Sequence, residues 1–100
     1  MATTSAKKIQ IENFTSPGRL YNVDAGKFNA MKAAYLQVVP KDAVGMTQAD
    51  IHRLVKAHLP QDLFPGGEKS GWWAKAVQLD LEAKGIIERS ATSPLRMRKI

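Results

Sequence analysis

The chain has 100 residues, 44% of them hydrophobic, so it has room for one domain with a usable core. The absence of cysteine excludes disulfides, thiolate metal sites and a cysteine nucleophile, and it fits a cytoplasmic location. No stretch approaches the roughly 18 apolar residues of a membrane-spanning helix. We therefore expect no membrane partner, and no motif calls for a cofactor.

The net charge of +6 and the isoelectric point near 9.8 favour contact with phosphate backbones or anionic lipid. Most of this charge is spread evenly along the chain. The exception is the C-terminal end, where four positive residues occur without any acid: Arg89, Arg96, Arg98 and Lys99. This local cluster, more than the overall charge, points to nucleic acid.

The N-terminal part is expected to contribute little to the core. Residues 1–7 are predicted to be a disordered tail, followed by a single domain over residues 8–100. Within residues 8–14, apolar and polar side chains alternate with a period of two, which predicts a possible extra strand. The segment Thr15–Gly18 is then predicted to form a turn.

Two helices follow this turn. Asp24 is expected to cap the first, whose apolar residues recur at helical spacing until Pro40 ends it near Val38. Thr47 is expected to cap the second, which Pro60 ends. The inner face of the second helix should contain Ile51, Leu54, Val55 and His58.

The last 31 residues carry the clearest pattern. Ser70 should cap a third helix that runs to Lys84, with Gly85 as its left-handed stop. A short apolar strand over 86–89, a turn and a basic strand over 95–99 should form an antiparallel hairpin.

The faces of this third helix follow from its 3.6-residue period. A wide apolar arc is assigned to the core: Trp72, Trp73, Ala76, Val77, Leu79, Leu81 and Ala83. Asp80 lies inside the arc and is expected to pair with Lys84. The remaining stripe, predicted to face solvent, consists of Gly71, Lys75, Gln78 and Glu82.

No cluster of residues predicts catalysis, so we expect the chain not to be an enzyme. The segment Gly67–Ser70 lacks the spacing of a nucleotide-binding loop, although Lys69 and Ser70 at the helix start could hold one phosphate. His52 and His58 are six residues apart, point to different helix faces and do not make a metal pair.

The segment GWWAKAVQLDLEAKGIIER and the basic strand after it resemble winged-helix domains. The pattern Leu81, Gly85, Ile86, Ile87, Arg89 is similar to that of N-terminal winged-helix modules in some restriction-related bacterial proteins. The whole chain, through LFPGG, WW and PLRMRK, also resembles a small family of uncharacterised bacterial proteins. The resemblance implies an α+β, winged-helix-like fold with a three-helix core and a small antiparallel wing.

Two functions are compatible with this fold. The first is binding of duplex DNA, with the third helix at a groove and the basic strand on phosphates. The alternative is a protein-interaction or dimerisation module that uses a surface at Trp72 and Phe64. The residues assigned to DNA contacts are Lys69, Ser70, Lys75, Gln78, Arg89, Arg96, Arg98 and Lys99.

Overall fold

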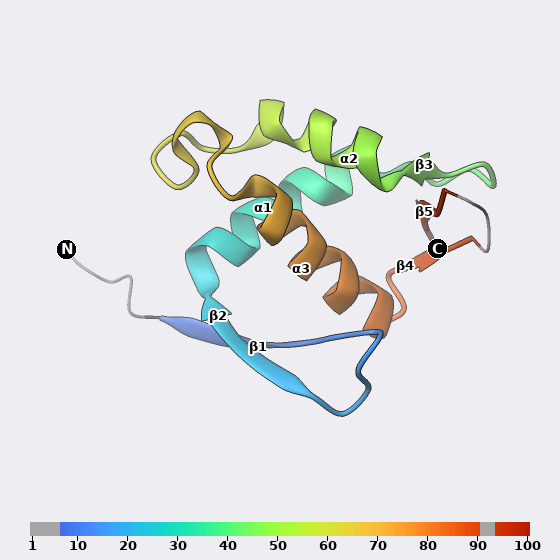
Figure 1. Ribbon diagram of the computed structural model, residues 1–100, viewed down its shortest axis with the longest axis horizontal. Coiled ribbons are helices and arrows are strands. Elements are labelled where there is room, and N and C mark those ends of the chain that lie inside the picture. Colours follow the sequence, from blue (N-terminus) through green and yellow to red (C-terminus); the bar gives the residue numbers. More distant parts are fainter. Residues whose placement is uncertain (1–6, 91–93) are drawn as a thin grey trace.

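The computed structural model describes residues 7–90 and 94–100. The predicted disordered tail lies outside these residues except for Lys7, and so does the middle of the predicted wing turn. The described chain forms three α-helices and two antiparallel sheets, which confirms the predicted mixture of helix and sheet (Figure 1).

A two-stranded hairpin begins the fold. Strand β1 (Lys8–Glu12) pairs with β2 (Leu20–Asp24), with Ile9 opposite Val23 and Ile11 opposite Tyr21. The sequence predicted β1 two residues too long and missed β2. The missed signal was a second short alternation, LYNVD, directly after the Pro17-Gly18 turn.

Helix α1 (Ala25–Val38) starts and ends as predicted. The carboxylate of Asp24 accepts a hydrogen bond from the Lys27 backbone N–H at 3.1 Å, so Asp24 is the cap. Phe28, Met31 and Tyr35 lie on its buried face.

Helix α2 (Gln48–Val55) is shorter than predicted and continues as a 3₁₀ turn over Lys56–His58. The cap is confirmed, because the Thr47 hydroxyl accepts from the Asp50 N–H at 3.3 Å. The placement of His58 on the inner face was wrong. The tighter 3₁₀ turn changes the helical phase, so His58 is exposed and Leu59 is buried instead.

Helix α3 (Ser70–Ala83) follows a 3₁₀ turn at Pro65–Gly67. Ser70 does not cap it, contrary to the prediction. Lys69 occupies the cap position in a left-handed conformation with φ of 59°, and this places Ser70 in the first turn, where it is 3% exposed. At the other end, Gly85 has the predicted positive φ.

The second sheet has the strand order β3–β5–β4. The predicted hairpin is confirmed as β4 (Ile87–Arg89) and β5 (Arg96–Lys99). The two-residue strand β3 (Met46–Thr47) pairs with the edge of β5 opposite β4. The sequence did not predict it, because two residues show no periodicity.

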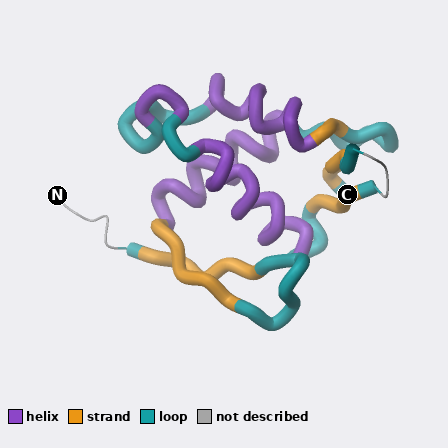
Figure 2. The backbone as a smooth tube through the Cα atoms, in the orientation of Figure 1, coloured by secondary structure: helices purple, strands orange, loops and turns teal. Residues whose placement is uncertain are grey.

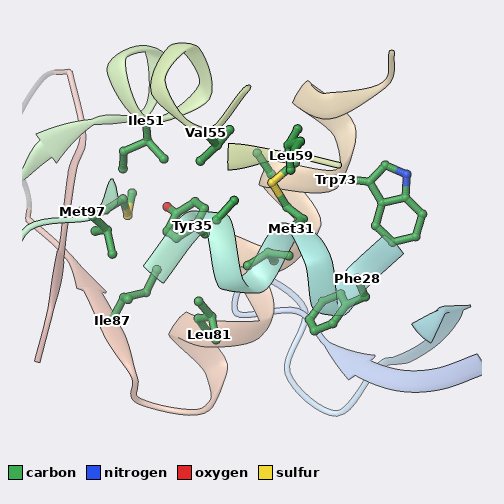
Figure 3. Packing of buried hydrophobic residues seen from close by; sticks show 14 of the residues in the cluster. Phe28, Met31, Tyr35, Ile51, Val55, Leu59, Trp73, Leu81, Ile87 and Met97 are labelled. Atoms are coloured by element: carbon green, nitrogen blue, oxygen red, sulfur yellow. The ribbon is translucent and has the colours of Figure 1, made fainter. Parts of the chain in front are cut away.

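One apolar core joins these elements, with residues from all three helices meeting the second sheet and the first hairpin (Figure 3). Tyr35, Ile51, Leu81 and Met97 are fully buried in it. Helix α3 packs on α1 and α2, while another part of its surface contacts β1 (Figure 2). The exposed surface of α3 is therefore bordered on one side by the hairpin.

Candidate functional site

The face of α3 that was predicted to read bases is buried in its C-terminal half. Gly71 and Lys75 are exposed as predicted, but Gln78 is 0% and Glu82 6% exposed, so their assignment to solvent was wrong. The Gln48 side chain donates to Gln78 at 2.5 Å, and Gln78 donates to Glu82 at 3.1 Å. A polar network with α2 thus occupies this half of the stripe, and Gln78 is inaccessible to a base edge.

Glu82 ends this network in an ion pair with strand β4. Arg89 donates to both carboxylate oxygens, at 2.5 and 2.9 Å, and its guanidinium lies 4.9 Å from the centre of the Phe14 ring. The hydrogen bond to Glu82 raises the pKa of Arg89. Burial, with the charge of Glu82 nearby, raises the pKa of Tyr35, whose hydroxyl has no partner among the described residues.

The other C-terminal cations also contact the protein itself. Arg98 forms an ion pair with Glu88, and Arg96 donates to the Gly45 carbonyl at 3.4 Å. The Lys99 ammonium donates to the carbonyl of Leu36 at 2.9 Å. The structure therefore does not bring the predicted DNA contacts together as one free cationic face.

Lys69 and Lys75 are the two predicted contacts whose side chains are exposed and have no hydrogen bond or ion pair among the described residues. Lys75 is electrostatically coupled to α2. Burial, together with the charges of Lys75 and Lys56, lowers the pKa of His52. Lys75 therefore lies close enough to α2 to act on His52.

The accessible face of α3 includes Lys75, as predicted, but it also exposes Trp72, which was assigned to the core. Trp72 is 59% exposed, while its neighbour Trp73 is 8% exposed and packs edge-on against Phe64. The two indoles are themselves edge-to-face at 5.0 Å. Phe64 is 1% exposed, so its predicted place on an interaction surface was wrong, whereas Trp72 fits that prediction.

A groove of about 350 Å³ lies between this face and the inner side of the hairpin. Its volume is in the range of ligand sites and of pockets that take an interface anchor. Most of its lining is apolar, and Lys75 and Glu12 contribute opposite charges. The lining residues are Ile11, Glu12, Asn13, Tyr21, Asn22, Val23, Trp72, Lys75, Ala76 and Leu79.

The hairpin is fixed to α3 by two backbone contacts. The Phe14 N–H donates to the Leu79 carbonyl at 3.2 Å, and the Glu12 N–H donates to the Asp80 carboxylate at 2.9 Å. The predicted Asp80–Lys84 pair is confirmed at 2.5 Å. The C-terminal end of β1 is thus attached to α3, and the groove has a defined wall.

Within residues 7–90 and 94–100, no three histidine or acidic side chains lie close enough together to hold a metal ion. No helix in the same residues is long and apolar enough to cross a membrane.

Comparison with known proteins places this α+β chain in a family. It belongs to a family of unknown function (DUF6958), whose model matches residues 8–97, and this confirms the predicted membership of an uncharacterised family. No curated protein and no solved structure matches the chain.

Proposed function

We propose that the chain is a winged-helix-like interaction domain whose binding surface is the groove between α3 and the β1–β2 hairpin. The element order from α1 onward supports the winged-helix part: helix, strand, helix, helix, strand, strand. The first of these strands lies beside the last, with β5 in the middle of the sheet. The N-terminal hairpin is an addition to this arrangement.

One observation carries the functional proposal. The accessible face of α3 presents Trp72 and Lys75 beside an apolar groove, and the polar residues Gln78 and Glu82 are buried in contacts with α2 and Arg89. A base-reading helix needs exposed donors and acceptors, whereas an exposed tryptophan beside an apolar pocket is characteristic of interaction hot spots. A protein partner therefore suits this surface better than duplex DNA.

A capped amino acid, N-acetyl-tryptophan amide, tests whether the groove accepts the side chain of an interface anchor. Titrated into labelled protein and followed by amide NMR, it should shift signals of the groove-lining residues and the Trp72 indole, with a Kd of about 1 mM. Trp72→Ala should weaken this binding at least about fivefold.

Val44→Ala is the matched control, since Val44 is 67% exposed but does not line the groove. It should leave the titration unchanged. A parallel titration with duplex DNA at low salt should leave the α3 amides in place. Shifts along α3 with DNA, or equal binding of the capped tryptophan by the Trp72→Ala variant, would overturn the interaction role.

A further inference from the structure

Strand β2 has an open edge on the side away from β1. The Ala25 N–H donates to the Lys7 carbonyl at 3.1 Å, which makes this a hydrogen-bonded pair of the antiparallel ladder. Hydrogen-bonded pairs alternate with non-hydrogen-bonded pairs along an antiparallel ladder. Val23 and Tyr21 therefore bond to β1, whereas Leu20 and Asn22 direct their N–H and C=O groups away from it. Neither backbone has a hydrogen-bond partner among the described residues.

This open edge has few of the features that usually prevent pairing, and its one charged residue is Asp24 at the end of the strand. Exposed edges are protected by lysine, proline, a bulge or a covering element. β2 reads LYNVD, with no basic residue or proline, and pairs residue for residue with β1. Its Leu20 side chain is 53% exposed. In contrast, the outer edge of β1 begins with Lys8, and its C-terminal end is held to α3 at Glu12.

We propose that the open edge of β2 pairs with β2 of a second copy of this chain. The inference rests on the proposed interaction role and adds a second copy of the chain as a partner at the strand edge next to the groove. A two-fold axis through Asn22 joins the two strands antiparallel, so that the outward backbone groups of Asn22 hydrogen-bond reciprocally. The two hairpins then form one four-stranded sheet.

The sequence of β2 is complementary to itself about this axis. Tyr21 lies opposite Val23 of the second copy on the side facing the groove, and aromatic with β-branched cross-strand pairs stabilise sheets. On the other side, Leu20 lies opposite Asp24, so no like charges are opposed. Since Tyr21 and Val23 both line the groove, the two grooves become parts of one apolar surface.

Asn22 is the position that tests this arrangement, because the axis brings its two copies together. Asn22→Lys and Asn22→Asp each oppose two like charges across the axis and should raise the dimer Kd at least about tenfold. An equal mixture of the two variants should restore the dimer, because opposite charges then meet. Sedimentation equilibrium over a wide range of protein concentration measures the dimer Kd of each variant and of their mixture.

Gln10→Lys is the matched control. Gln10 is exposed and lies opposite Asn22 within the hairpin, away from the open edge, so the same charge there should leave the dimer Kd unchanged. Hydrogen exchange gives a second measurement. The amides of Leu20 and Asn22 should become protected as the protein concentration rises, while those of Tyr21 and Val23 are already protected within the hairpin.

The effect of salt distinguishes self-association from binding to nucleic acid. Each copy carries a net charge of +6, so added salt should strengthen self-association, whereas it weakens DNA binding. A monomer at every concentration, or an Asn22→Lys variant that associates like the wild type, would overturn self-pairing. If the groove still binds the capped tryptophan, the interaction role stands; if it does not, that role fails as well.

Discussion

The side chain of Arg89 shows how a residue that resembles a DNA contact is used to pair a buried acid. The side chain of its partner Glu82 is 1% exposed, and Gln78 and Tyr35 lie in the same region. A buried carboxylate needs a compensating cation or donors. Arg89 supplies that charge from β4 and covers Phe14 of the hairpin connection, so it links three parts of the fold.

Removing Arg89 should therefore destabilise the protein. Arg89→Ala leaves the Glu82 carboxylate buried and unpaired, and we expect a loss of about 2 kcal/mol in the free energy of unfolding, measured by urea denaturation. Adding Glu82→Gln to this variant should recover part of the loss, because the buried charge disappears.

Arg53→Ala serves as the comparison, since the ion pair of Arg53 with Asp50 is exposed and should contribute less than about 1 kcal/mol. Equal losses for the two arginines would show that burial of Glu82 does not govern this contact. So would a double variant no more stable than Arg89→Ala alone.

At the scale of elements, two glycines with similar backbone conformations have different surroundings. Gly45, which precedes β3, and Gly85, which follows α3, have φ of 72° and 73°. A Cβ on Gly45 would lie 2.9 Å from the Met97 carbonyl oxygen, whereas a Cβ on Gly85 would meet nothing within 4 Å. The pairing of β3 with β5 thus requires the absence of a side chain at residue 45.

Alanine substitutions at the two glycines separate the cost of the left-handed backbone conformation from the cost of the clash with β5. Gly85→Ala should cost about 1 kcal/mol, from the left-handed conformation alone. Gly45→Ala adds the clash with β5 and should cost at least about 2 kcal/mol. Thermal or urea unfolding of both variants gives the comparison, and equal costs would mean that β3 moves away from β5 without penalty.

For the whole molecule, the attachment of the hairpin to α3 determines the shape of the groove. Asp80 is the main side chain in this attachment, as its carboxylate accepts from the Glu12 N–H and from Lys84. Asp80→Ala should release the hairpin, seen as faster hydrogen exchange at Glu12 and Phe14 with little change at core amides of α1.

Asp80→Asn keeps an oxygen acceptor for the Glu12 N–H and should preserve most of that protection. Uniformly faster exchange throughout the chain, or unchanged exchange at Glu12 in the Asp80→Ala variant, would contradict a local role. In either case the hairpin and α3 would not be joined through this carboxylate.

Sequence patterns were sufficient where the determinant is local. Asp24 and Thr47 cap their helices through neighbours three residues away, Gly85 stops α3, and alternation predicts the β4–β5 hairpin. The candidate site was less predictable. Helical periodicity grouped Trp72 with the core and Gln78 with solvent, and the structure has the opposite.

The sequence by itself determined the α+β class, the three helices, the caps of α1 and α2 and the terminal hairpin, because these depend on short-range hydrogen bonds and periodicity. Tertiary structure alone decided which face of α3 remains accessible. A helical wheel ranks faces by hydrophobicity, but burial depends on partners: Gln48 and Arg89 satisfy Gln78 and Glu82 of α3. Since these two polar residues can then be buried, the apolar Trp72 is left exposed beside the groove.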